Sequence, residues 1–417
     1  MNRLANAPAP DGRDASAESS AESSAESFTD ALGLYISFPF CRSKCSYCNF
    51  ASNVFPPRLL DGYLACLERE MELVAEAESV GGGSVDTLYW GGGTPSLLAP
   101  DLALRLAQAI RRIWTPAPEA EFTLEAAPGT LSTAHIAAWR AAGVNRVSLG
   151  MQSWQEAEIR SVGRLHRAED VTRDLEALRR AGLENLNLDL IAGLPHQTEA
   201  SWRDTLARTL DAAPPHISIY MLEVDEDSRL GRELLAGGAR YHAHAVPDDD
   251  RTADFFELAV EQLAAAGWRQ YEISNFARDG GESRHNLRYW ARRPYLGFGL
   301  EAHSMLRRDG EERRWANPAE LKEYMAALEA GRLARGEVEA LSPQRQLEEA
   351  LFLGLRRNAG IGWDELTAEF KAGAVEAKRA AITPMLAQGM LEESQGRLRL
   401  TPRGRMLSTS VLAELLE

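Results

Sequence analysis

The strongest constraint on the fold is a repeated pattern in which a short apolar run is followed by a stretch of helical periodicity. Such repeated strand–helix units build a parallel sheet with helices on its outside. About six units predict an α/β fold, a partial (β/α)6 TIM-like barrel, in which ligand sites lie at the C-terminal ends of the strands. The strands are expected at Leu34–Phe38, Thr87–Trp90, Phe122–Glu125, Arg146–Leu149, Leu186–Leu190, Ile217–Met221 and Tyr271–Ile273.

The expected helices between these strands carry recognisable ends. The first covers Leu59–Glu78, and a later one has apolar residues at helical spacing and ends at Gly182. Glycine relieves the left-handed backbone that closes a helix, and Gly143 and Gly267 follow alanine in the same way before the next strand. Ser132 is expected to cap the helix that Gly143 ends.

The first thirty residues differ from the rest in composition. The string SAES recurs three times between Ser16 and Ser27. Serine, alanine and glutamate bury too little apolar area to offset chain entropy, so residues 1–30 are expected to be a disordered tail. A tail of this kind that binds a partner is the alternative interpretation.

The pattern changes again near residue 343. Helices are expected at Gln346–Arg356, at about 363–370 and at about 374–388, before a strand at Arg397–Leu400 and a final helix. This order predicts a small winged-helix-like domain over 343–417. Some such domains bind DNA, but the charges here are mixed, which favours a docking or lid role.

Composition excludes several classes of protein. A net charge of −15 over 417 residues argues against a broad surface for nucleic acid or anionic lipid. No apolar run approaches the roughly 20 residues of a membrane-spanning helix, and the first residues lack the apolar core of a secretory signal. We therefore expect a cytoplasmic protein without stable membrane insertion. Four cysteines are too few for a disulfide scaffold.

Three of those cysteines stand close together in the segment YISFPFCRSKCSYCNF. Cys41, Cys45 and Cys48 have the spacing C-x3-C-x2-C. Three thiolates can hold three irons of a [4Fe–4S] cubane, and the fourth iron is left open for the amino and carboxylate groups of S-adenosylmethionine (SAM). A zinc site is the first alternative, but zinc usually takes four ligands and no second cysteine pair is present. Buried structural thiols are the second, and this is the interpretation we give to Cys66.

These cysteines and a second motif resemble the radical SAM superfamily. The superfamily has the same cysteine spacing, with an aromatic residue before the last cysteine. It also has a glycine-rich turn like Trp90-Gly91-Gly92-Gly93-Thr94-Pro95-Ser96. The resemblance implies that this turn approaches the methionine amino group of SAM. Glycine suits that role because it lets backbone come close to a ligand.

Within the superfamily, the chain resembles the coproporphyrinogen-oxidase-like group from about 33 to 410. The shared stretches are YISFPFC, GGGTPS, LEAAPGT, VSLGMQS, GRLHRAED, NLDLIAGLPHQT and LTPRG. The resemblance implies that Tyr35, Gly92 and Glu125 contact the SAM beside the cluster. It further implies that a second SAM or a substrate is contacted by Gly93, Thr94, Gln152, Arg164 and Asp189.

Two features distinguish the members of this group. The oxygen-independent coproporphyrinogen III oxidases (HemN) have a cysteine two residues after the third, whereas this chain has Phe50, as the HemW-type heme chaperones do. The string HNLRYW also resembles the heme chaperones and is associated there with heme. His285 could offer an axial nitrogen, and Tyr289 and Trp290 aromatic surface. His303, in EAHS, is a second candidate. The alternative is that His285 bridges backbone and that the aromatic residues fill core.

The chain departs from the group's pattern at two positions. The group usually has an asparagine two residues after the glutamate that corresponds to Glu125, and here Ala127 replaces it. This replacement puts a hydrogen bond near SAM in doubt. Glu301 replaces a glycine before His303. This carboxylate is expected either to pair with His303 or to repel a nearby propionate.

The resemblance therefore implies a heme chaperone with SAM, a [4Fe–4S] cluster and heme as cofactors. It implies a barrel over 31–275, a heme-associated extension over 276–342 and a HemN-type domain over 343–417. The expected partners are heme, an electron donor and acceptor hemoproteins, among them membrane-bound respiratory enzymes; no nucleic acid is expected. The runner-up is a coproporphyrinogen III oxidase, so enzymatic activity is left open. A weaker third interpretation is an unrelated radical SAM enzyme, or a protein that binds nucleic acid through its C-terminal domain.

Overall fold

A computed structural model describes residues 31–278, 280–308 and 310–415. The tail predicted over residues 1–30 lies outside these ranges. Within them, a sheet of twelve strands has the order β12-β11-β10-β9-β1-β2-β3-β4-β5-β6-β8-β7. Six of its strands run parallel and follow one another in the chain, as the sequence predicts. They are β1 (Leu32–Phe38), β2 (Ser84–Gly92), β3 (Thr115–Ala126), β4 (Arg146–Gln152), β5 (Asn185–Ala192) and β6 (His216–Met221).

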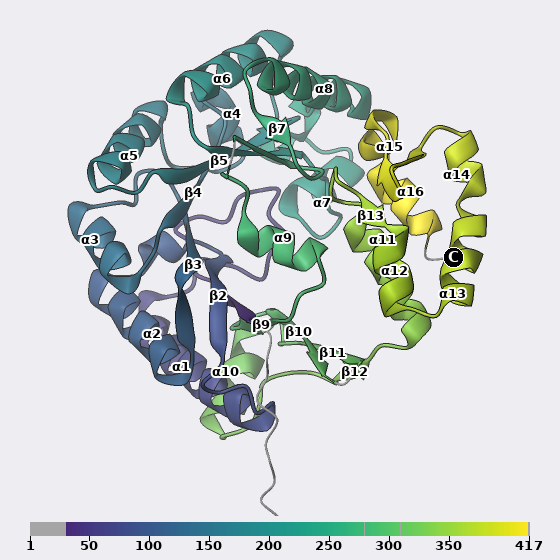
Figure 1. The fold of residues 1–417 in the computed structure, drawn as a ribbon. Coiled ribbons are helices and arrows are strands. Elements are labelled where there is room, and N and C mark those ends of the chain that lie inside the picture. The colour runs from purple at the N-terminus through teal and green to yellow at the C-terminus, as the bar shows by residue number, and fades with distance from the viewer. Residues whose placement is uncertain (1–30, 279, 309, 416–417) are drawn as a thin grey trace, which may run out of the picture.

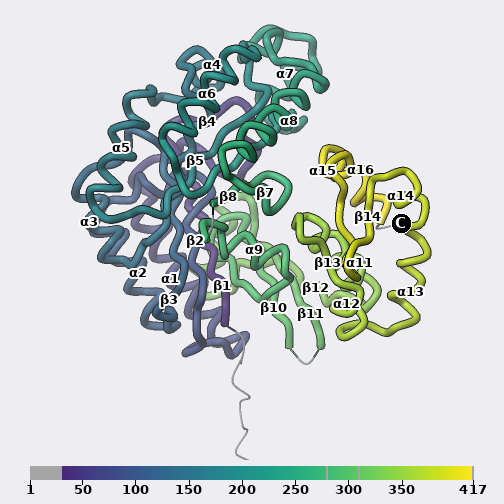
Figure 2. The backbone as a smooth tube through the Cα atoms, turned by 45° about the horizontal axis from the view of Figure 1, so that its top comes forward, coloured from purple at the N-terminus to yellow at the C-terminus, as the bar shows by residue number. Residues whose placement is uncertain are grey.

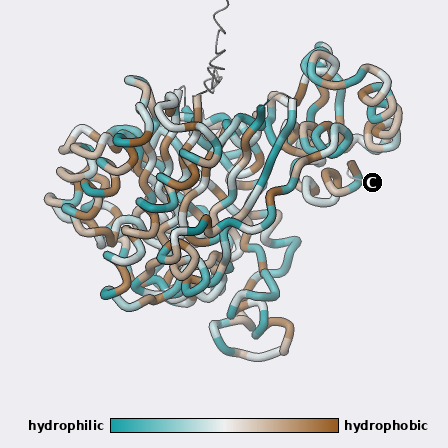
Figure 3. The backbone as a smooth tube through the Cα atoms, turned by 90° about the horizontal axis from the view of Figure 1, so that it is seen from below, coloured by the Kyte–Doolittle hydropathy of each residue, from teal (hydrophilic) through white to brown (hydrophobic). Residues whose placement is uncertain are grey.

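Helices cover the outer side of these strands in a continuous arc (Figure 1). Hydrophilic and hydrophobic positions alternate along them (Figure 3), because one face of each helix packs on the sheet while the other meets water. None of the helices in the described ranges is both long enough and apolar enough to cross a bilayer. The helices of the arc are α1 (Leu60–Ala77), α2 (Pro100–Ile113), α3 (Thr133–Ala142), α4 (Glu156–Ser161), α5 (Ala168–Arg180), α6 (Glu199–Ala212) and α8 (Asp249–Ala265). Helix α7 (Arg229–Leu235) lies inside the arc (Figure 1), where the N–H of Leu230 donates to the carbonyl of Ser46 at 2.8 Å.

The expected helix ends are confirmed in α3. The Ser132 hydroxyl accepts a hydrogen bond from the backbone N–H of His135 at 3.3 Å, and Gly143 ends the helix with a φ of 96°. Gly182 and Gly267 also have left-handed φ angles, of 79° and 91°. These local signals fix the lengths of the helices, and therefore where each following strand enters the sheet.

The prediction of a strand at Tyr271–Ile273 is wrong. The chain instead forms a hairpin of β7 (Arg269–Gln270) and β8 (Asn275–Ala277), and β8 pairs antiparallel with β6. The backbone N–H of Tyr271 donates to the carbonyl of Asn275 at 3.1 Å, which closes the turn. Ile273 packs in the core of the C-terminal domain. Its side chain is therefore apolar because it makes a contact between domains, not because it belongs to a barrel strand.

The region 276–342 extends the sheet beyond β1, which the sequence did not indicate. Strand β9 pairs parallel with β1, and the strands after it continue antiparallel. The extension contains α9 (Arg284–Trp290), β9 (Tyr295–Phe298), β10 (His303–Arg308), β11 (Glu311–Ala316), α10 (Leu321–Glu329) and β12 (Glu339–Ala340).

The C-terminal residues form a separate lobe beside the barrel (Figure 2). It has its own hydrophobic core and a three-stranded sheet of order β13-β15-β14. The helix expected at about 374–388 is divided at Ile382, next to Pro384, whose nitrogen has no hydrogen to donate. The lobe contains α11 (Pro343–Gly354), β13 (Ile361–Gly362), α12 (Trp363–Glu369), α13 (Ala372–Ala381), α14 (Thr383–Ala387), β14 (Leu391–Ser394), β15 (Arg397–Leu400), α15 (Pro402–Met406) and α16 (Ser408–Glu414).

Candidate functional site

The cysteine loop directly follows β1 and is held by hydrogen bonds to its own backbone. The N–H of Cys41 donates to the carbonyl of Asn53 at 2.9 Å, which draws the two ends of the loop together. The Lys44 ammonium donates to the carbonyls of Phe50 and Ser52 at 2.5 and 2.8 Å. These bonds fold the loop around its three thiols, which are half-buried.

The three thiols line one cavity of about 600 Å³ at the C-terminal ends of the barrel strands. The Thr94 hydroxyl donates to the sulfur of Cys41 at 3.6 Å, and burial raises the pKa of that thiol. Among the described residues, no three His, Cys, Asp or Glu side chains converge to hold a single ion. A cubane takes one thiolate at each of three separate irons, so three spaced cysteines on one loop fit a cluster better than a mononuclear site.

The glycine-rich turn at the end of β2 packs directly against the cysteine loop. The N–H of Gly93 donates to the carbonyl of Phe38 at 2.8 Å, and the N–H of Thr94 donates to that of Phe40 at 2.9 Å. A Cβ atom on Gly93 would lie 2.7 Å and 2.9 Å from those same two oxygens, so a larger residue would force the backbone to shift. Gly92 has a φ of 99°, which also requires glycine. The two motifs of the sequence analysis therefore form one unit.

Glu125 lies at the end of β3, inside the cavity. Its carboxylate accepts hydrogen bonds from the Tyr89 hydroxyl at 2.9 Å and from the N–H of Gly92 at 3.2 Å. Burial, followed by the nearby charge of Asp189, raises its pKa to about 7. A carboxyl poised at neutral pH beside backbone that approaches the cysteines is suited to bind an ammonium or hydroxyl group.

The neighbouring strand ends complete this wall of the cavity. Asp189, on β5, accepts from the Ser148 hydroxyl at 2.9 Å and from the Asn187 amide at 2.7 Å, and burial raises its pKa. Gln152, at the end of β4, has a left-handed φ of 69°. Arg164 donates to the hydroxyl of Tyr47 at 3.2 Å. Gly92, Gly93, Thr94, Glu125, Gln152, Arg164 and Asp189 all line the cavity of the cysteines.

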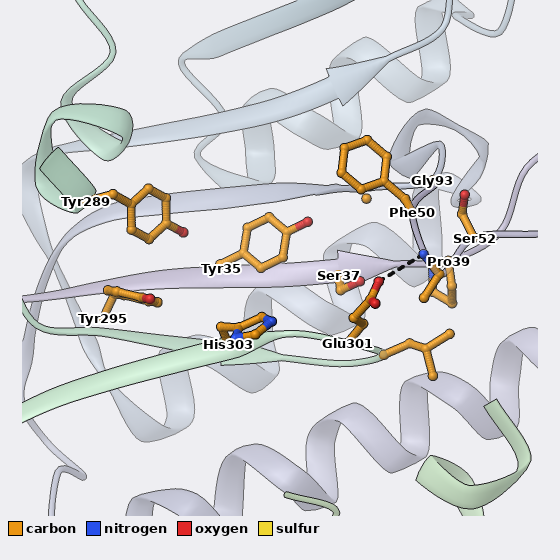
Figure 4. A pocket seen from close by; sticks show the side chains of 13 residues that line it. Tyr35, Ser37, Pro39, Phe50, Ser52, Gly93, Tyr289, Tyr295, Glu301 and His303 are labelled. Carbon is orange, nitrogen blue, oxygen red and sulfur yellow. Dashed lines mark hydrogen bonds between the residues drawn. The ribbon is translucent and has the colours of Figure 1, made fainter. Parts of the chain in front are cut away.

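Tyr35 is the one predicted SAM residue that does not line this cavity. It lies in a smaller cavity of about 400 Å³ with Tyr289, Tyr295, Glu301 and His303 (Figure 4). Phe50, Ser52, Gly92 and Gly93 line both cavities, so the two adjoin. Tyr289 and His303, predicted for heme, therefore lie together and next to the cysteine loop.

His285 and Trp290 line neither cavity. His285 is 1% exposed, with Nδ1 2.9 Å from the Thr87 hydroxyl and Nε2 2.8 Å from that of Tyr289. Burial and the nearby Arg288 lower its pKa to about 3. Both nitrogens of a neutral imidazole are thus engaged by side-chain hydroxyls, and not by the backbone that the alternative interpretation expected. The ring of Trp290 lies under the guanidinium of Arg356 at 4.6 Å.

The C-terminal lobe provides a side of the cavity that no sequence motif predicts. Arg356, Arg405, Met406, Ser408 and Thr409 all line it. No motif marked these residues, because single arginines and serines in helices are common on protein surfaces. Only the packing of the lobe against the barrel reveals them.

Comparison with known proteins agrees with this geometry. Residues 35–209 match the radical SAM superfamily, and residues 341–407 match the HemN C-terminal domain. The heme chaperone HemW of Bacillus subtilis is 32% identical over 92% of this chain and 98% of its own length. The chain belongs to the HemW family. This confirms the resemblance stated above.

Other relatives extend the comparison. The HemW of Synechocystis is 37% identical over 80% of this chain and 79% of its own length. A mouse mitochondrial protein, radical S-adenosyl methionine domain-containing protein 1, is 33% identical over 92% and 87%. The solved structure of Escherichia coli HemN, a radical SAM enzyme, is 24% identical, with a TM-score of 0.80 over 93% of this chain and 90% of that one. This likeness confirms the predicted fold class.

Proposed function

We propose that this chain is a heme chaperone that binds heme and a SAM-ligated [4Fe–4S] cluster, and that transfers heme to acceptor hemoproteins. The observation that carries the proposal is the joining of the cysteine loop, the glycine turn and Glu125 in one cavity. The family supports the heme part, since curated relatives are named heme chaperones. We expect the transfer in the cytoplasm, with membrane-bound respiratory enzymes among the acceptors.

Cys41, Cys45 and Cys48 are the proposed ligands of the cluster. When bound, the cluster supplies an open iron for the amino and carboxylate groups of SAM, and a redox centre that an electron donor can reduce. The chain's own part is to orient SAM. The Glu125 carboxylate attracts the ammonium group, and the backbone of Gly92 and Gly93 gives the ligand room beside the loop.

His303 is the better placed of the two histidines proposed for heme. Its side chain is exposed and lines the smaller cavity, whereas His285 would have to break a hydrogen bond to Thr87 or Tyr289 before it could bind iron. Tyr289 adds aromatic surface in the same cavity. Arg356 covers the ring of Trp290, so Trp290 would act on heme only by supporting this arginine.

Phe50 argues against the alternative of a coproporphyrinogen III oxidase, because it occupies the position of the oxidase's additional cysteine. Its ring is 63% exposed on the wall that the two cavities share. The deciding experiment pairs two assays on anaerobically reconstituted protein. We expect about one hemin bound per chain, and no protoporphyrinogen from coproporphyrinogen III with SAM and a reductant. Clear protoporphyrinogen formation would overturn the chaperone proposal.

A further inference from the structure

The wall that the C-terminal lobe adds to the large cavity carries two arginines, Arg356 and Arg405. Arg356 follows α11, and Arg405 lies in α15. They come from different parts of the lobe, yet both side chains reach the cavity that holds the cysteines on its other side. The function proposed above gives neither of them a role.

Arg356 forms no hydrogen bond or ion pair with an anion in the part of the chain that the structure describes, and the charges of Glu272 and Glu223 act on it only from farther away. Its guanidinium makes no hydrogen bond or ion pair there, its Nε is buried without an acceptor, and it lies over the face of Trp290. A half-buried guanidinium without an acceptor costs free energy, so such groups are normally paired. The burial also lowers its pKa.

Arg405 is similar. One of its nitrogens donates to the carbonyl of Leu400 at 3.2 Å. No described carboxylate forms an ion pair with it, and the charge of Glu392 acts on it only from farther away. Other arginines of the same lobe are paired with carboxylates: Arg379 with Glu393 at 3.1 Å, and Arg399 with Glu392 at 2.7 Å. The two guanidiniums of the cavity wall therefore lack the ion pairs that Arg379 and Arg399 have.

The carboxylates that line the cavity include Glu125 and Asp189 at the barrel's strand ends. The barrel side also carries the cations Arg42, Lys44 and Arg164, so its charges are mixed. The lobe adds Arg356 and Arg405 to the lining and no carboxylate, so its part of the wall attracts anions. Guanidinium groups recognise carboxylates through paired N–H donors, and two of them fit a ligand with two carboxylates. Heme carries two propionates, whereas SAM carries one carboxylate.

We propose that Arg356 and Arg405 bind the propionate carboxylates of heme, so that the C-terminal lobe is the part of the protein that recognises the tetrapyrrole. This inference rests on the proposed heme-binding function and adds the residues that select the ligand. It requires heme to extend from His303 in the smaller cavity into the large one, which adjoins it along Phe50 and Gly92. SAM remains at the barrel side, beside the cysteine loop and Glu125. The carboxylates of the lining thus all lie on the barrel side, and the lobe presents only positive charge.

The first test needs no variant. Hemin and hemin dimethyl ester, whose propionates carry no charge, are titrated into the full-length protein and followed by the heme absorption band. We expect the ester to bind about tenfold or more weakly, the factor for loss of a charge-assisted hydrogen bond. Equal affinities overturn the inference and leave the proposed function intact. A protein that binds neither compound refutes the proposed function itself.

The second test uses matched pairs of variants. Arg356→Met is compared with Arg357→Met, whose side chain does not line the cavity, and Arg405→Met with the exposed Arg403→Met. We expect hemin to bind about tenfold more weakly to the first member of each pair only, and hemin dimethyl ester to bind all four alike. Thermal unfolding checks that each variant folds.

A titration of SAM completes the design, because SAM is the other source of a carboxylate. We expect its affinity to stay unchanged in Arg356→Met and Arg405→Met. If these substitutions weaken SAM and leave hemin unaffected, the arginines bind SAM and the inference is wrong.

Discussion

Replacement of Glu125 by glutamine tests whether its carboxyl is held at the edge of ionisation. The pKa rises from an ordinary value of 4.5 to about 7 in the folded chain. The folded protein therefore keeps a proton that the unfolded chain has already lost. Stability from this group is full below about pH 4.5, falls as the pH rises to about 7 and is constant above it, a total loss of about 3 kcal/mol.

Glutamine removes this pH dependence because it does not ionise. The glutamine amide oxygen can still accept a hydrogen bond from one of the two donors, Tyr89 or Gly92. Loss of the hydrogen bond from the other donor costs about 1 kcal/mol of stability. Wild type and Glu125→Gln should then be about equally stable at pH 5. At pH 8 the variant should be more stable by about 2 kcal/mol. The same substitution should weaken SAM about tenfold, because the ammonium group loses its counter-charge.

The assay is urea unfolding of cluster-free protein at pH 5 and pH 8, followed by tryptophan fluorescence. Glu70→Gln is the matched control for SAM binding. Burial raises the pKa of Glu70 to about 7 as well, but its carboxylate bonds Tyr324, Gly299 and Asn317 outside the cavity. SAM should bind this control normally. A stability difference between wild type and Glu125→Gln that stays constant from pH 5 to pH 8 would refute the reasoning.

Three further predictions concern the cysteine loop and the histidines. Cys45→Ala should lose most labile iron and sulfide. Cys66→Ala should keep both, because Cys66 lies in α1 and burial raises the pKa of its thiol to about 11. Retention of iron and sulfide in Cys45→Ala would contradict the assignment. His303→Ala should change the absorption spectrum of bound heme, whereas His285→Ala should leave it unchanged and lower the melting temperature; the reverse result would return the ligand to His285. Gly93→Ala should destabilise the protein by about 1–3 kcal/mol in thermal unfolding and lower its affinity for SAM in a titration, because the added Cβ meets backbone atoms. A normal affinity for SAM would show that the turn shifts to accommodate the Cβ.

The parts of the site that the sequence predicts well depend on short stretches of chain. Cys41, Cys45 and Cys48 share one loop, and Gly92 and Gly93 share one turn. A parallel barrel then brings the ends of its strands to one side. Once β1 to β6 were recognised, the meeting of these motifs followed from topology alone.

The missed parts depend on contacts between distant segments. Tyr35 faces the smaller cavity because β9 pairs with β1, and no periodicity of the chain predicts that pairing. His285 matched a family motif, but its ring is held by a hydrogen bond with Thr87, nearly two hundred residues away in the sequence. Ile273 reads as a strand residue until the core of the C-terminal lobe is known.

Glu301 shows how a departure from a family pattern acquires a structural role. It has a left-handed φ of 55°, a conformation that costs a non-glycine residue about 1–2 kcal/mol and explains why the family has glycine there. Its carboxylate accepts a hydrogen bond from the backbone N–H of Ala51 at 3.0 Å, and no described bond joins it to His303. Because this bond is exposed to solvent, which screens the charge, it offsets only part of that strain. The substitution thus links the cysteine loop to the wall of the smaller cavity, so a ligand that displaces this carboxylate would release one restraint on the loop that holds the cysteines.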